Sequence, residues 1–120
     1  MKTIDRIDSL IQFQKRFKKH ATLGKGTLRM GRRIPKFLTL PVVLTENKEI
    51  FGYIKIDLLI WLQFEDIIKY PEIIRREYPD CKNILKDIKT IYPNLKRDTW
   101  MTFYGFKFLK RSNLKKLNKR

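Results

Sequence analysis

The chain has 120 residues, 42% of them hydrophobic and 12% aromatic, which suits a single globular domain with a real core. It carries 28 lysines and arginines against 12 acidic residues, a net charge of +16 at pH 7. With one cysteine and one histidine, the sequence predicts no disulfide, no metal site of the Cys/His kind and no histidine-based catalytic pair. The longest apolar run, residues 58–62, is too short to cross a membrane, so we expect a soluble cytoplasmic protein.

Hydrophobic periodicity predicts a few strands and several short helices. Residues 1–8 have no clear pattern, and we interpret them as a helical or disordered lead-in. The expected elements, in chain order, are a strand over 9–14, a basic helix over 15–22, strands over 27–30, 37–45 and 49–64, helices over 65–70, 71–78 and 81–92, and a strand over 99–109.

Particular residues refine these expectations. Phe17 and Ala21 are spaced to face the core from the basic helix. Residues 31–36 are expected to form a turn, in which Pro35 breaks any strand pairing. The long strand is expected to bend or bulge near Gly52 and to pair with the strand before it as a hairpin. Few strands with helices beside them predict a small α+β barrel.

The positive charge is concentrated at the two ends of the chain. Residues 1–40 contain 11 basic and 2 acidic residues, and residues 107–120 contain 7 basic and no acidic residues. Residues 41–106 balance 10 basic against 10 acidic residues. A generally basic surface would spread its charge, so this segregation predicts a face that binds a polyanion.

Residues 23–36 combine three glycines with a high density of cations and no acid. Glycine allows close approach to a ligand, and arginine forks bind phosphate. We interpret the segment as the lip of a nucleic-acid site; the alternative is an exposed basic loop without a specific ligand. The predicted RNA-binding residues in this segment, the preceding helix and the C-terminal segment are Lys15, Arg16, Lys18, Lys19, Lys25, Arg29, Arg32, Arg33, Lys36, Lys107, Lys110, Arg111, Lys115, Lys116, Lys119 and Arg120.

The C-terminal segment is strongly basic. Residues 110–120 hold six bases and no acid, so we expect a tail that becomes ordered on its partner and a domain that ends at residue 109. Such a tail suits a large and permanent polyanion.

Six aromatic residues have the chemistry to stack on bases, but their alternation along strands places about half of them in the core: Trp61, Trp100, Phe103, Tyr104, Phe106 and Phe108.

Three stretches in this order resemble the ASCH domains of the PUA-like superfamily. The first is G-K-G-T-L-R-M-G-R-R at residues 24–33, and the second is F-G-Y-I-K-I at residues 51–56, which leads to F-E-D-I. The third runs from R-R-E-Y-P-D to T-W-M-T-F-Y-G-F-K-F at residues 75–108. The resemblance covers about residues 10–109 and implies a β-barrel with flanking helices and a cleft lined by the basic loop.

The same resemblance implies two kinds of function, because members divide between RNA-associated modules and small hydrolases, including one that acts on acetylated cytidine. In the hydrolases a loop Lys and Thr act with a Glu after the central strand. Thr27 matches the Thr position here, but Gly24 stands at the Lys position, with Lys25 one residue late. Leu59 and Ile60 stand where the acid is expected, and only a register shift or bulge would bring Asp57, two or three residues earlier, into its place.

We therefore predict a non-catalytic, RNA-binding accessory or structural protein of a large ribonucleoprotein particle such as the ribosome. Its expected partners are structured RNA and neighbouring proteins of the particle, with no cofactor, metal or membrane. One alternative is an ASCH-type hydrolase acting on modified cytidine or RNA. The other is a binder of membrane surfaces or acidic proteins, and it ranks last because the tail lacks an amphipathic face with large aromatic residues.

Overall fold

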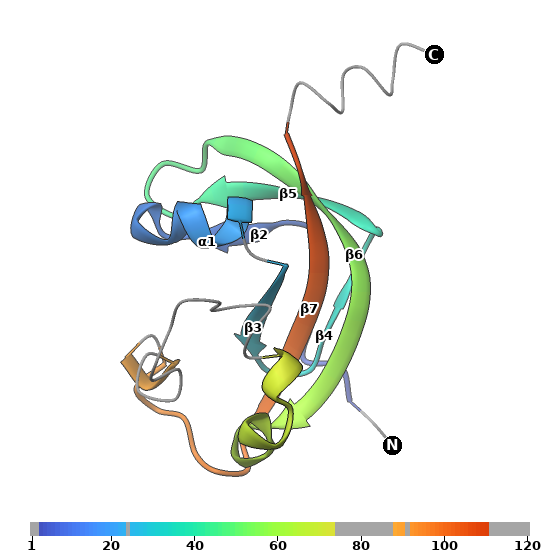
Figure 1. Cartoon of the computed structure of the whole chain (residues 1–120), viewed down its shortest axis with the longest axis vertical. Helices are drawn as coiled ribbons and strands as arrows, with labels where there is room; N and C mark the ends of the chain where they lie inside the picture. Colours follow the sequence, from blue (N-terminus) through green and yellow to red (C-terminus); the bar gives the residue numbers. More distant parts are fainter. Residues whose placement is uncertain (1–2, 24, 74–87, 91, 111–120) are drawn as a thin grey trace.

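The computed structural model describes residues 3–23, 25–73, 88–90 and 92–110. A curled five-stranded sheet forms its body, with strand order β2-β5-β6-β7-β3, and a two-stranded sheet of β1 and β4 lies beside it (Figure 1). The elements are β1 (Arg6–Asp8), β2 (Ile11–Phe13), the 3-10 helix η1 (Lys15–Phe17), α1 (Lys18–Leu23), β3 (Gly26–Met30), β4 (Arg33–Pro35), β5 (Thr39–Leu44), β6 (Ile50–Gln63), the 3-10 helix η2 (Phe64–Lys69) and β7 (Trp100–Leu109).

The five strands expected from periodicity are all present, and β5 and β6 form the expected antiparallel hairpin. The basic helix is confirmed as η1 followed by α1, with Ala21 fully buried. Most of the two later helices, predicted over 71–78 and 81–92, lies outside the described residues; residues 71–73 and 88–90 are helical.

Two irregularities curl the large sheet. Val42 pairs with Gly52, but Val43 pairs with Ile50, so β6 has an extra residue beside Gly52, as the sequence indicated. A second extra residue, Asp57, follows further along β6. Because a bulge bends its strand and increases the local twist, the two together fold the sheet into a half-barrel.

The small sheet corrects two expectations. Residues 1–8 are not a lead-in without a strand, because β1 pairs in parallel with β4, Ile7 opposite Ile34. Pro35 does not break the pairing either, since it lies opposite Asp8 inside β4. Both strands of a two-stranded sheet are edge strands, where the missing amide hydrogen of proline is tolerated.

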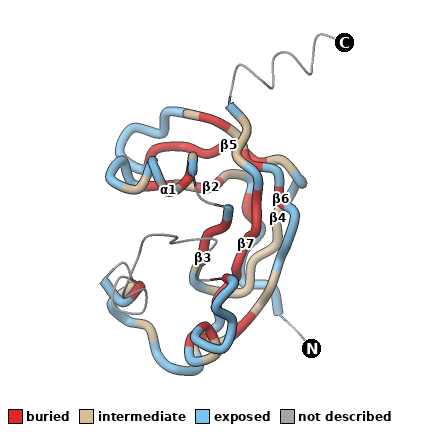
Figure 2. Tube along the Cα trace, viewed as in Figure 1, coloured by how far each residue is buried: buried red, intermediate tan, exposed pale blue. Residues whose placement is uncertain are grey.

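Most of β7 is buried (Figure 2), and its residues belong to two hydrophobic clusters. Tyr104 and Phe106 join the cluster inside the half-barrel, which also contains Ala21 of α1. Phe103 joins the cluster on the opposite face, together with Ile67 of η2. Three of the six candidate stacking aromatics are therefore fully buried, which confirms the expectation for about half of them.

Candidate nucleic-acid interface

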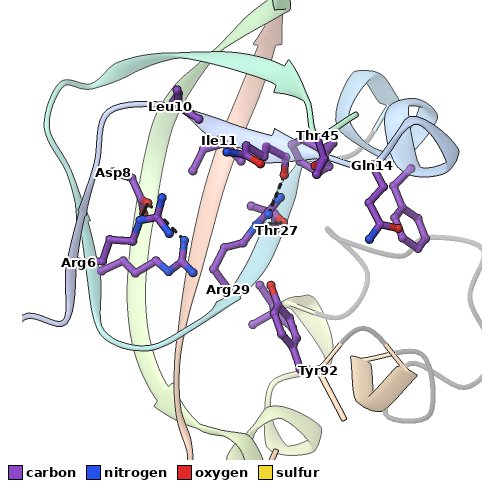
Figure 3. Close-up of a pocket in the computed structure, with 15 residues that line it drawn as sticks. Arg6, Asp8, Leu10, Ile11, Gln14, Thr27, Arg29, Thr45 and Tyr92 are labelled. Carbon is purple, nitrogen blue, oxygen red and sulfur yellow. Dashed lines mark hydrogen bonds and ion pairs between the residues drawn. The ribbon is translucent and has the colours of Figure 1, made fainter. Parts of the chain in front are cut away.

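A cavity of about 340 Å³ opens between β1, β2 and β3 (Figure 3). Its wall combines aromatic rings with charged and hydroxyl side chains. The lining residues that take part in ion pairs, hydrogen bonds or cation–π contacts include Arg6, Asp8, Gln12, Phe13, Thr27, Arg29 and Arg33.

Asp8 is the polar centre of this cavity, with a side chain only 1% exposed. Its carboxylate accepts a hydrogen bond of 2.8 Å from the Tyr104 hydroxyl. Arg6 Nε and Arg33 Nη1 each lie 3.3 Å from Asp8 Oδ1. Burial, followed by this hydrogen bond to Asp8, raises the pKa of Tyr104, so the phenol remains a neutral donor. The negative charge of the buried Asp8 carboxylate is therefore balanced by two arginines and by the hydrogen bond from Tyr104.

Arg29 is held in place beside Asp8 by three contacts. Its Nη1 donates to the Gln12 carbonyl at 2.7 Å, and its Nε donates to Thr27 Oγ1 at 3.2 Å. Its guanidinium carbon lies 4.6 Å from the centroid of the Phe13 ring, a cation–π contact. A guanidinium fixed in this way is organised in advance for an anion or a carbonyl oxygen that enters the cavity.

The turn between β3 and β4 is also tied down. Arg32 Nε lies 3.5 Å from Asp5 Oδ2, and the guanidinium of Arg32 lies 5.6 Å from the centroid of the Trp100 ring. The backbone N–H of Arg32 donates to Asp5, which together with the nearby guanidinium lowers the pKa of that carboxyl. The backbone N–H of Arg33 donates to Thr102 Oγ1 at 2.7 Å. This basic segment is thus a folded part of the barrel.

The local structure favours glycine at two positions of this segment. A Cβ at Gly26 would collide with the ring of Phe103, so this glycine permits the close packing of β3 on β7. Gly31 has φ of +92°, which favours glycine in the turn after β3. The flanking Lys25 and Lys36 are both exposed.

The helix α1 contacts β7 and lies in the same half of the molecule as the end of that strand (Figure 1). Lys18 Nζ is 5.4 Å from the centroid of the Phe51 ring, and that ring stacks on Phe108 with centroids 6.2 Å apart. The helix and the end of β7 therefore form one surface. We call it the cationic end and define it by four exposed lysines: Lys15, Lys18, Lys19 and Lys110.

None of these four lysines forms an ion pair with a carboxylate within the described part of the chain. Arg16, on the same segment, donates to Gln14 at 2.7 Å and lies over Phe17. Lys107 is exposed on the outer face of β7 at the same end. The remaining predicted residues lie outside the described residues: Arg111, Lys115, Lys116, Lys119 and Arg120.

The hydrolase pattern implied by the family resemblance is present only in part. Thr27 is buried and lines the cavity, but no lysine lines it among the described residues. Leu59, at the position expected for the acid, is 37% exposed. The cavity's carboxylate is Asp8 of β1, which sequence reasoning missed because nothing local marks that residue as buried.

Two features are absent from the described residues: a group of metal ligands and a membrane-spanning helix. Across residues 3–23, 25–73, 88–90 and 92–110, no three His, Cys, Asp or Glu side chains come together in a way that could hold a metal ion. In the same ranges, no helix has the length and apolar character needed to cross a membrane.

Comparison with known proteins identifies the fold. No family model matches the chain, and no curated protein matches it significantly. The crystal structure of ASCH from Zymomonas mobilis superposes with a TM-score of 0.58 at 11% identity, over 92% of this chain and 78% of that chain. Two point mutants of that protein give TM-scores of 0.54 and 0.56 at 13% and 16% identity, over 92% and 98% of this chain and 81% and 84% of theirs. The chain therefore has an ASCH-like fold, a small α+β barrel of the PUA-like type, as the sequence resemblance indicated.

Proposed function

We propose that this protein is an RNA-binding accessory or structural subunit of a large ribonucleoprotein particle such as the ribosome. The supporting observation is that Lys18 packs on Phe51, which stacks on Phe108 near the end of β7. Because of these contacts, the basic N-terminal region and the start of the basic C-terminal segment share one surface. Cations that are far apart in the sequence can then contact one continuous polyanion.

The chemistry of the cationic end suits phosphate groups. Its lysines are exposed, and within the described residues none of their ammonium groups forms an ion pair; the Glu46 carboxylate accepts the backbone N–H of Lys15 instead. Each phosphate contact releases condensed counterions, so the affinity falls steeply as salt rises. The preference for RNA comes from the family resemblance and agrees with a sequence that has neither a helix-turn-helix nor a zinc-finger pattern.

In this proposal the cations divide into two groups. Lys25, Lys36 and the C-terminal tail extend the contact made by the cationic end. Arg32 and Arg33 already contact Asp5 and Asp8, and they hold the barrel together more than they hold RNA. The cavity is then a structural neighbour of the interface.

The test is a titration of structured RNA at several salt concentrations with the full chain. We expect binding at low salt with a steep dependence of log affinity on log salt. A shallow dependence, or no binding at low salt, contradicts the proposal. Purification of the native protein through a high-salt wash tests the particle: retention of ribosomal or other stable RNA and proteins supports it, and a nucleic-acid-free monomer contradicts it.

A matched pair of variants locates the interface. Replacing Lys15, Lys18 and Lys19 by alanine should weaken RNA binding strongly. The control replaces three exposed lysines of η2 and of the segment before β7, Lys69, Lys89 and Lys96, of which Lys69 is paired with Asp66, and changes the net charge by the same amount. Equal losses in the two variants mean that only net charge matters and that the cationic end is not the site.

The cavity supports a second candidate, a hydrolase acting on modified cytidine or on RNA. The favouring observation is that the buried carboxylate of Asp8, the hydroxyl of Thr27 and the fixed guanidinium of Arg29 line one cavity of about 340 Å³. Incubation with acetylated cytidine and with RNA tests it. Turnover that disappears in Thr27→Ala, Lys25→Ala or Asp8→Asn, each with its fold checked, establishes the hydrolase; absence of turnover in the wild type removes it.

A further inference from the structure

The outer face of the large sheet carries two lysines directly opposite each other. Lys55 of β6 is the register partner of Lys107 of β7, and both side chains are exposed. Directly opposed residues have Cβ atoms about 4.5–5.5 Å apart, and like charges in this arrangement repel. Strand alternation places both lysines on the outside, because Ile54 and Ile56, which flank Lys55, and Phe106, which precedes Lys107, face the buried cluster.

The direct register partners of Lys55 are Lys107 on one side and Thr39 on the other, so no acid lies directly opposite it in the ladder. Asp57 follows two residues later in β6, at the bulge between the Ile56–Phe106 and Leu58–Gly105 pairs. Neither lysine forms an ion pair with a carboxylate in the described part of the chain. The site is therefore complementary to an anion that bridges the two ammonium groups.

The adjacent row of the same face is apolar and aromatic. Tyr53 lies between Pro41 and Leu109, and it is separated from Lys55 by two residues, about 6.6 Å along the strand. Tyr53 as a whole is partly exposed. A partly exposed aromatic residue beside a pair of cations is a combination by which proteins hold single-stranded nucleic acid, with bases stacked and phosphates neutralised.

We infer that this outer face, formed by Tyr53, Lys55 and Lys107, is a second RNA contact and binds a single-stranded segment. Lys55 and Lys107 bind backbone phosphates, and the Tyr53 ring stacks on a base. This inference rests on the proposed RNA-binding function and extends it, because it adds Lys55 and Tyr53, which composition and charge did not single out. Lys107 sits two residues before the end of β7, three residues before Lys110 of the cationic end.

The test uses two probes, a short oligouridylate and an RNA hairpin of equal charge, each titrated against the full chain at several salt concentrations. For the double variant Lys55→Ala/Lys107→Ala we expect about a tenfold or larger loss of oligouridylate affinity at low salt. The slope of log affinity against log salt should fall by about 1.4, because each single-strand phosphate contact contributes about 0.7. The control Lys89→Ala/Lys96→Ala removes the same charge from exposed sites in the segment before β7 and should change neither value.

The tyrosine is tested separately. Tyr53→Ala should weaken oligouridylate binding by about fivefold to a hundredfold with an unchanged salt slope, as expected for one base stack. Tyr53→Phe keeps the ring and should bind like the wild type. An affinity in Tyr53→Ala equal to the wild type, or a loss in Lys55→Ala/Lys107→Ala no larger than in the control, overturns the inference.

The two probes separate this inference from the function on which it rests. A wild-type protein that binds the hairpin with a steep salt dependence but ignores the oligouridylate refutes the outer-face contact alone. A protein that binds neither RNA refutes both proposals.

Discussion

Two regions of this molecule use the same positive charge in opposite ways. In the region of β1 and β4, Arg6 and Arg33 both lie within 3.3 Å of the buried Asp8, and Arg32 lies 3.5 Å from Asp5. At the cationic end, the lysines form no ion pair with a carboxylate within the described residues. The two regions are similarly basic in sequence and differ in what their cations contact.

This difference shows that a net charge of +16 is not a count of binding residues. In the region of β1 and β4 the paired cations are arginines, whose planar and weakly hydrated groups suit close contact with a buried carboxylate. The four cations that define the cationic end are lysines, whose compact charge stays hydrated and available to phosphate. We therefore expect the arginines of the first region to govern stability and the lysines of the second to govern binding.

The largest expected effect is on RNA affinity. In Lys15→Ala/Lys18→Ala/Lys19→Ala, affinity at about 0.1 M salt should fall on the order of a hundredfold, and the salt slope by about one for each lysine. Stability should stay close to the wild type, because these side chains are exposed and their removal leaves no buried charge. Fluorescence anisotropy with labelled RNA gives the affinity, and urea denaturation gives the stability.

The double variant Arg6→Ala/Arg32→Ala, which removes two paired charges, should behave in the reverse manner. Its urea midpoint should drop because the carboxylates of Asp5 and Asp8 each lose a partner, whereas its salt slope should stay near the wild-type value. A slope that falls as much as in the lysine variant would show that paired arginines also contact RNA, and the division between the two regions would fail.

The next effect concerns stability. Asp8→Ala leaves Arg33 without its buried partner and the Tyr104 hydroxyl without an acceptor, so unfolding free energy should fall by about 3–5 kcal/mol. Asp5→Ala removes a carboxylate that is 47% exposed and should cost clearly less. Urea denaturation compares the two. Equal losses of unfolding free energy in the two variants would mean that the ion pairs of the buried Asp8 contribute no more to stability than that of the exposed Asp5.

A third effect appears at alkaline pH. Because burial raises the pKa of Tyr104 in the folded state, the unfolded chain loses this proton first. The contribution of Tyr104 to stability is therefore complete below the unfolded pKa of about 10, and above it falls by about 1.4 kcal/mol per pH unit. In Tyr104→Phe this part of the pH dependence of the unfolding free energy should vanish. At neutral pH the variant should be less stable by about 1–3 kcal/mol, because Asp8 loses the hydrogen bond donated by the tyrosine hydroxyl. Denaturation across this pH range measures both, and an unchanged slope contradicts the assignment.

The strands that could be predicted from sequence are those with long alternating patterns. Over residues 99–109 the alternation extends across ten paired positions, and β7 occupies 100–109. β1 and β4 have three residues each and pair in parallel, so neither has a readable period or a hairpin turn. A proline within β4 pointed further away from a strand, because sequence does not reveal that this strand lies at an edge.

The charged surface was predictable in part for a similar reason. Segregation of lysine and arginine can be read from the chain, but the pairing of each cation depends on contacts across the fold. Arg33 meets a carboxylate 25 residues away, and Tyr104 meets the same carboxylate from 96 residues away. Such separations leave no local signal, so Asp8 and the cavity around it emerged only from the structure.

The smallest expected effect tests whether the sheet lysines belong with the unpaired class. In a double-mutant cycle of Lys55→Gln and Lys107→Gln, the two single variants should each gain stability at low salt, and the double variant should gain less than their sum. The repulsive coupling should be about 0.2–1 kcal/mol, the range for cross-strand pairs. It should vanish near 1 M salt, where the screening length is about 3 Å and shorter than the separation of the two charges. Zero coupling at low salt would mean that the ammonium groups diverge, and a single phosphate would then be unable to bridge them.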